Sequence, residues 1–252
     1  MRSSPIMFAV LGACSAVLSA VPDARATNVQ IVDRATGQVL PTFEYQGRSY
    51  VAGEPGHEYA IGVRNDGGTR VMAVMSVDGV NAITGQTAAP MQSGYVLDPY
   101  GYLRIEGWRK SMSRTAAFYF TRLPDSYAAR TGRPENVGVI GVAVFPERTA
   151  CCAQLEESIG SDQAAAPPAA AANERADSTR RAESKLGTGH GRSEYSAAQY
   201  TRFERASAVP DEVITIYYDS RRNLLAQGII PFHPRQADGL PQPFPARFVP
   251  DP

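Results

Sequence analysis

The sequence is poor in the residues that build metal and redox sites. Only three cysteines, three histidines and one tryptophan occur among 252 residues. The histidines are far apart along the chain and from the cysteines, without the short spacing of metal ligands, so we predict no metal site and no cofactor. The local motifs of hydrolases and of phosphate-binding loops are absent too.

Excess charge is also lacking. The 25 basic residues balance 25 acidic ones, and the only lysines are Lys110 and Lys185. Removing residues 1–26 takes away two arginines and one aspartate, which leaves 23 basic against 24 acidic residues. Without a basic field the surface does not attract phosphate polymers, so we expect no nucleic-acid partner.

The first 26 residues have the pattern of a cleavable secretory signal peptide. Arg2 precedes an apolar run over residues 6–21, and Ala-Arg-Ala at residues 24–26 matches the A-x-A cleavage pattern. The apolar run is shorter than the ~20 residues of a stable transmembrane helix. We therefore predict an exported protein, periplasmic or extracellular, that begins at Thr27 and has no stable transmembrane span after processing.

The three cysteines leave alternatives open. The apolar run could stay as an anchor, or Leu-Gly-Ala-Cys at residues 11–14 could be a lipoprotein site with Cys14 lipidated. The other two, Cys151 and Cys152, are adjacent. An oxidising compartment permits a vicinal disulfide between them, but its eight-membered ring is strained and easily reduced.

The aromatic residues divide the chain. None occurs between Phe145 and Tyr195, and the intervening segment is rich in alanine, proline and mixed charge, a composition that does not build a core. We interpret the chain as a signal peptide (1–26), a β-sandwich domain (27–148), a low-complexity tether (149–186), a small module (187–230) and a proline-rich tail (231–252).

Alternation of apolar and polar residues predicts strands in the first module. Tyr59, Ile61 and Val63 fall on one face of such a strand. Asn-Asp-Gly-Gly at residues 65–68 predicts a tight hairpin turn into a strand at 69–77. Further strands are predicted at residues 29–33, 38–45, 102–106, 115–121 and 138–145.

Helix is scarce, with one short helix predicted at residues 125–130 and Asp125 as its N-cap. This amount of helix is too small to cover the faces of a parallel sheet. We therefore expect a mainly β fold, namely an antiparallel β-sandwich of Greek-key or jelly-roll type. The second module is expected to be a three-stranded β-meander docked on the sandwich, because three strands are marginal alone. Its strands are predicted at residues 194–205, 212–218 and 223–230, with a turn at 219–222.

Six short stretches carry a further signal. They are Ser-Val-Asp-Gly-Val-Asn at 76–81, Gly-Trp-Arg-Lys-Ser at 107–111, and residues 127–134, 138–145, 186–191 and 218–221. With these stretches the chain resembles a group of uncharacterised exported proteins of Gram-negative bacteria. The resemblance implies export and an envelope or extracellular location, and it implies no activity.

Candidate catalytic residues are few. His190 lies among the glycines of residues 187–191 and is the best candidate general base, because histidine titrates near neutral pH. A flexible junction between tether and strand would need the same glycines. Asp78, Asp98 and Asp125 each occupy a predicted turn or cap position, where aspartate serves local hydrogen bonding.

One cluster could serve recognition. It comprises Tyr95, Tyr100, Tyr102 and Trp108, followed by Arg109. Exposed aromatic side chains bind sugar faces and protein partners, although aromatic residues also build sandwich cores.

These observations favour a non-catalytic binding or structural protein of the cell envelope. It would recognise a glycan or a protein partner through the loops of the sandwich. The alternative is a secreted or periplasmic hydrolase that uses His190 as its general base.

Overall fold

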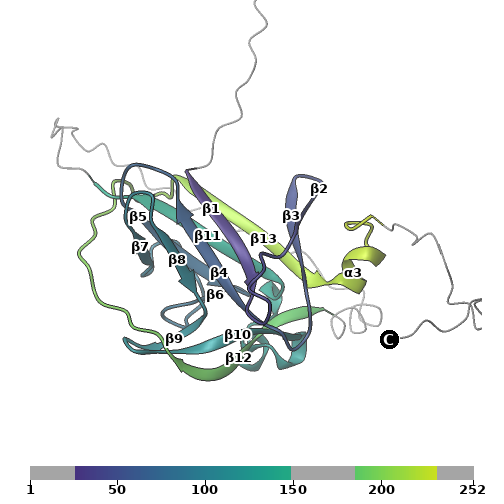
Figure 1. Ribbon diagram of the computed structural model, residues 1–252. Coiled ribbons are helices and arrows are strands. Elements are labelled where there is room, and N and C mark those ends of the chain that lie inside the picture. The colour runs from purple at the N-terminus through teal and green to yellow at the C-terminus, as the bar shows by residue number, and fades with distance from the viewer. Residues whose placement is uncertain (1–25, 149–184, 232–252) are drawn as a thin grey trace, which may run out of the picture.

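The computed structural model describes residues 26–148 and 185–231. Two multi-stranded sheets face each other around one core (Figure 1), which confirms the predicted mainly β fold and the β-sandwich. The predicted signal peptide, most of the tether and nearly all of the tail lie outside the described residues. So do Cys14, Cys151 and Cys152.

The first sheet is antiparallel throughout. Its strands follow the order β1-β4-β10-β12, with β8 paired to β4 and β9 paired to β10. Their bounds are β1 Thr27–Asp33, β4 Glu58–Asn65, β8 Tyr102–Ile105, β9 Gly107–Ser111, β10 Arg114–Arg122 and β12 Leu186–Tyr195.

The second sheet is mixed, in contrast to the antiparallel prediction. Its order is β2-β3-β13-β11-β5-β6, with β7 paired to β5, and β13 runs parallel to β3. Because no hairpin joins β3 to β13, β13 can pair with β3 in the parallel direction. The bounds are β2 Thr42–Tyr45, β3 Arg48–Gly53, β5 Val71–Val77, β6 Val80–Asn81, β7 Tyr95–Leu97, β11 Val139–Pro146 and β13 Glu212–Ser220.

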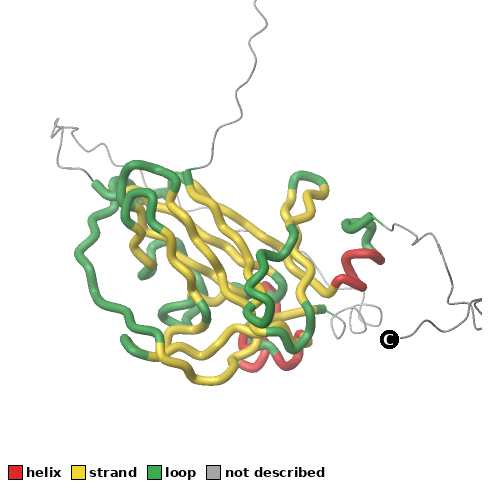
Figure 2. The backbone as a smooth tube through the Cα atoms, viewed as in Figure 1, coloured by secondary structure: helices red, strands yellow, loops and turns green. Residues whose placement is uncertain are grey.

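The helices in the described residues are short (Figure 2). They are η1 Leu123–Asp125, α1 Tyr127–Arg130, η2 Pro134–Asn136 and α3 Arg221–Ala226. The predicted N-cap at Asp125 is wrong: Ser126 caps α1 by accepting a hydrogen bond from the Ala129 amide at 3.2 Å. Asp125 ends η1 and pairs with Arg122 instead.

The core between the sheets contains the face predicted from β4. Tyr59, Ile61 and Val63 are fully buried, and the Tyr59 ring stacks on Phe120 with centroids 4.3 Å apart. Burial of such a side chain stabilises a fold by roughly 1.5–3 kcal/mol. The alternation read from the sequence thus identifies the inward face correctly.

The predicted hairpin turn at residues 65–68 is wrong. β4 belongs to the first sheet and β5 to the second, so this segment crosses between the sheets. The Asn65 amide holds the crossing, because it donates to the carbonyls of Thr69 at 2.8 Å and Asp98 at 2.9 Å. Its side-chain oxygen accepts from the Gly67 amide at 3.0 Å.

The predicted C-terminal meander is also wrong, although its expected contact with the sandwich is confirmed. β12 pairs with β10 at an edge of the first sheet, and β13 lies between β3 and β11 in the second. The predicted turn and third strand are replaced by α3, which Ser220 caps. The helix forms because Leu224, with Ile229 and Ile230 after it, packs on the outer side of β2 and β3.

Candidate functional site

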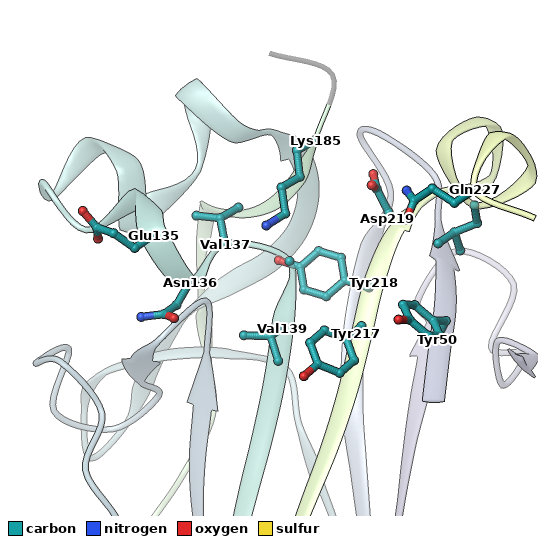
Figure 3. Close-up of a pocket in the computed structure, with 12 residues that line it drawn as sticks. Tyr50, Glu135, Asn136, Val137, Val139, Lys185, Tyr217, Tyr218, Asp219 and Gln227 are labelled. Carbon is teal, nitrogen blue, oxygen red and sulfur yellow. The ribbon is translucent and has the colours of Figure 1, made fainter. Parts of the chain in front are cut away.

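A pocket of about 250 Å³ opens at one end of the sandwich (Figure 3). It lies where η2 leads into β11, where β13 leads into α3, and where the chain enters β12. The lining residues are Tyr50, Glu135, Asn136, Val137, Gly138, Val139, Lys185, Tyr217, Tyr218, Asp219, Leu224 and Gln227.

Two tyrosine rings form one wall of the pocket. Tyr50 of β3 and Tyr217 of β13 have ring centroids 5.5 Å apart, and the Arg48 guanidinium lies 5.8 Å from the Tyr217 centroid. Alternation along β13 explains this position, because Ile216 and Tyr218 point into the core and Tyr217 points outward. Tyr217 therefore offers an aromatic surface outside the core, while Tyr50 also packs against the cluster of Leu224, Ile229 and Ile230.

Polar residues also line the pocket. Glu135 and Asn136 stand on one side in Figure 3, Gln227 and Asp219 on the other, and Lys185 extends above Tyr218. Asp219 is held by its surroundings, since Oδ1 accepts from the Ser220 amide at 2.7 Å and from the Asn223 side chain at 2.8 Å. The pocket thus combines an aromatic wall with amide, carboxylate and ammonium groups.

The buried carboxylate of Asp78 lies beneath the pocket. Oδ1 accepts hydrogen bonds from the Gly138 amide at 2.9 Å and the Tyr218 hydroxyl at 2.5 Å, and Oδ2 accepts from the Thr188 amide at 2.7 Å. Burial raises the pKa of Asp78 to about 6, against the lowering effect of these donors. One carboxylate therefore joins the β5–β6 turn to β11, β12 and β13.

The hydroxyl groups next to Asp78 form a directed chain. A carboxylate only accepts, so Tyr218 donates to Asp78, Thr188 donates to Tyr218 at 2.6 Å, and Tyr59 donates to Thr188 at 2.7 Å. Burial is the main cause that raises the pKa of both tyrosines. Every hydroxyl in this chain has a partner, so the arrangement is a structural clamp with no free group.

Sequence reasoning missed the role of Asp78. Asp78 and Gly79 both have positive φ, 52° and 74°, as a two-residue hairpin turn requires, and this local role is the predicted one. The side chain, however, reaches Thr188, 110 residues away. No local pattern signals that contact. The outward position of Tyr217, by contrast, follows from the alternation of β13.

The predicted aromatic cluster is divided by the fold. Trp108 is a core residue, 4% exposed, and donates to the Gly189 carbonyl at 3.2 Å. Tyr95 is largely buried, and Arg109 donates to the Ser196 carbonyl at 2.6 Å. Tyr100 and Tyr102 are exposed, and the Tyr102 side chain, in the same sheet as Trp108, covers Gly62. Arg109 and Tyr95 do meet, with the guanidinium 6.0 Å from the ring centroid, but the exposed Tyr100 and Tyr102 and the buried Trp108 do not form one recognition surface with them.

His190 lies in strand β12 rather than in a flexible loop. Its ring stacks on Tyr127 with centroids 5.4 Å apart, and burial, then Lys110 and Arg130, lower its pKa. The neighbouring glycines serve packing, since a Cβ on Gly189 would come within 2.2 Å of the Tyr119 ring. No acid or hydroxyl among the described side chains is hydrogen-bonded to His190, so the expected catalytic partner is not in place.

A second histidine does have an acid partner. The Nδ1 atom of His57 lies 2.8 Å from Asp33 Oδ2. Burial opposes ionisation of Asp33, but hydrogen bonds from His57 and from the Thr36 and Ala35 amides outweigh it and lower the pKa of Asp33. Within residues 26–148 and 185–231, no hydroxyl or thiol is hydrogen-bonded to His57, so the pair has no nucleophile to activate.

Across the described parts of the chain, no three histidine, cysteine, aspartate or glutamate side chains gather as metal ligands would. No helix in those parts is long and apolar enough to cross a bilayer.

Comparison of the chain with models of known protein families, with curated proteins and with solved structures finds no match.

Proposed function

We propose that this protein is a non-catalytic binding protein of the bacterial cell envelope, and that its pocket binds one sugar unit of a glycan. The observation that carries the proposal is the wall of Tyr50 and Tyr217 in a pocket that amide and carboxylate residues also line. An aromatic face packs on the apolar face of a sugar ring, while amides and carboxylates bind its hydroxyl groups.

The size of the pocket favours a small group over a protein surface. Its volume of about 250 Å³ is slightly below the ~300–1,000 Å³ of pockets for drug-sized ligands. One sugar ring fits such a space, and the rest of a glycan would extend along the exposed side chains of Glu135, Asn136 and Gln227. The proposed site lies at the ends of sandwich strands and uses other residues than the aromatic cluster predicted from the sequence.

The alternative of a hydrolase has weaker support. His190 stacks on Tyr127 without a hydrogen-bonded acid or hydroxyl in the described structure. His57 has Asp33 but no neighbouring nucleophile there. Neither histidine lines the pocket.

The test is binding of residues 27–252 to an array of bacterial envelope oligosaccharides, followed by calorimetry with the strongest hit. Tyr217→Ala removes one of the two rings of the aromatic wall and should weaken binding at least about tenfold, whereas Tyr217→Phe keeps the ring and should bind within about threefold. Tyr102→Ala, an exposed tyrosine on the other sheet, is the matched control. If no oligosaccharide binds, or if Tyr102→Ala weakens binding as much as Tyr217→Ala, the proposal fails.

A further inference from the structure

The predicted cleavage site of the signal peptide lies at the very edge of the fold. Cleavage after Ala26 would break the peptide bond between Ala26 and Thr27, and β1 begins at Thr27 itself. The bond is therefore directly adjacent to the first strand, and the contacts of its two residues decide whether a protease can reach it.

The carbonyl of Ala26 is hydrogen-bonded in the folded chain. Its oxygen accepts from the Asp66 amide at 2.7 Å. This bond extends the antiparallel pairing of β1 with β4, in which Thr27 lies opposite Asn65. A protease polarises the carbonyl of the bond that it cleaves by donating hydrogen bonds to the same oxygen. In the folded chain the Asp66 amide already contacts that oxygen.

Thr27, on the other side of the bond, is buried. It is 1% exposed, and its partner Asn65 is fully buried. Asn65 is itself fixed at the crossing between the sheets, because its side chain donates to the carbonyls of Thr69 and Asp98. Proteases cut first where the backbone is exposed and has no such partners. The fold therefore protects the bond on both sides.

We propose that the Ala26–Thr27 bond is hydrolysed before β1 pairs with β4, and that the precursor reaches the protease of the export route unfolded. Water supplies its hydroxyl group to the Ala26 carbonyl carbon and its other proton to the Thr27 nitrogen, and the carboxyl proton then moves to the amine. The products are a carboxylate at Ala26 and an ammonium at Thr27. The inference rests on the predicted signal peptide and does not depend on what the pocket binds.

A precursor that folds first can be cleaved only when the end of β1 opens. Opening breaks the hydrogen bond between Asp66 and Ala26, exposes Thr27 and withdraws Val29, which packs against the core. When opening is rare, cleavage follows the population of the open form. The folded precursor should therefore be cleaved at least about tenfold more slowly than the unfolded one.

The experiment compares two preparations of the full precursor, residues 1–252, in detergent with purified bacterial signal peptidase. One preparation is folded beforehand, and the other is diluted from urea directly into the protease. The initial rate of cleavage is measured, and the mass and N-terminal sequence of the product identify the bond. We expect cleavage after Ala26 in the unfolded preparation and at least about tenfold slower cleavage in the folded one.

Two outcomes would overturn the proposal, and they differ in meaning. Equal initial rates in the two preparations would show that the fold does not protect the bond. Cleavage of the unfolded precursor at another bond would instead show that the predicted site is wrong.

Two buried asparagines provide matched variants. Asn65 holds the crossing beside Ala26, whereas Asn81 holds a turn in the second sheet, where its side-chain oxygen accepts from the Ile83 amide at 2.8 Å and the Thr84 amide at 3.0 Å. In the folded precursor, Asn65→Ala should speed cleavage at least about tenfold more than Asn81→Ala does. Circular dichroism checks that both variants are folded, and the comparison of folded with unfolded wild type decides the question if Asn65→Ala is not. An acceleration by Asn65→Ala no greater than that by Asn81→Ala would show that the contacts around Ala26 do not protect the bond, which overturns the proposal.

Discussion

Asp78 links pH to stability at the scale of a single residue. Its pKa in the folded protein, about 6, lies above its ordinary value of 3.8. The folded state therefore favours the protonated acid. The contribution of Asp78 to stability is fully present below about pH 4 and falls as the pH rises through about 6, by roughly 3 kcal/mol.

Asp78→Asn should remove this dependence. The amide does not ionise in this range, and its NH₂ group would face amide donors, so we expect a variant less stable at pH 4 by about 1–3 kcal/mol. The difference should shrink or reverse by pH 7.5, because only the wild type loses the Asp78 contribution. Urea unfolding across this range measures it. A difference that stays constant with pH would show that Asp78 does not titrate as inferred.

Tyr218 tests the clamp without changing its charge. Tyr218→Phe removes one donor to Asp78 and one acceptor for Thr188, and should cost about 1–3 kcal/mol. Tyr217→Phe, the adjacent residue with its ring outside the core, should change stability by less than about 0.5 kcal/mol. Equal effects in thermal unfolding would contradict the assigned clamp.

At the scale of strands and helices, close backbone contact explains one glycine. A Cβ on Gly107 of β9 would lie 2.1 Å from the Ala116 carbonyl oxygen of β10. That contact is with backbone, which cannot rotate away. Gly141 of β11 is different, because its added Cβ would meet only the Ser76 Cβ, at 3.8 Å.

Gly107→Ala should therefore destabilise the protein by about 3 kcal/mol, whereas Gly141→Ala should be neutral or slightly stabilising. Chemical denaturation of both variants compares their free energies of unfolding. The interpretation of Gly107 is wrong if the two variants unfold at the same denaturant concentration.

Sequence patterns predict several strands of the first module and β13, but they miss β3, β9 and β12 and say little about which strands pair. The inward face of β4 and the extent of β11 follow from alternation within a few residues. The clamp does not, because Tyr218 and Asp78 are 140 residues apart. Likewise, residues 223–230 have an apolar pattern that fits a strand. They form the helix α3 and the turn after it because their apolar side chains pack on the outer surface of β2 and β3. Of the pocket, alternation indicates Tyr217, and nothing local indicates that Tyr50 lies beside it.

At the scale of the whole molecule, the two parts of the chain should not fold separately. Without β13, strand β3 loses its link to β11, and Ile214, Ile216 and Tyr218 leave the core. Each costs roughly 1.5–3 kcal/mol, against a typical total stability of 5–15 kcal/mol. Residues 27–148 and 186–252 should each be largely unfolded alone and should assemble when expressed together. Circular dichroism and amide exchange test this, and a stable fragment 27–148 would contradict it.

The predicted cleavage of the signal peptide can be tested on the intact protein. β1 begins at Thr27, the residue that the predicted cleavage would make the new N-terminus. N-terminal sequencing of protein from the cell envelope should therefore begin Thr-Asn-Val-Gln. A lipid-modified Cys14 at the N-terminus would instead support the lipoprotein alternative.

The position of β13 inside its sheet also determines when that sheet can form during synthesis of the chain. This strand is the last in the described chain, yet it occupies an interior position in its sheet, beside β3 from the other end of the sequence. A ribosome that has made 200 residues has therefore produced both flanking strands but not the one between them. Contacts of such long sequence separation form late and slowly. A growing chain of this protein cannot close its second sheet until residues 212–220 have been made.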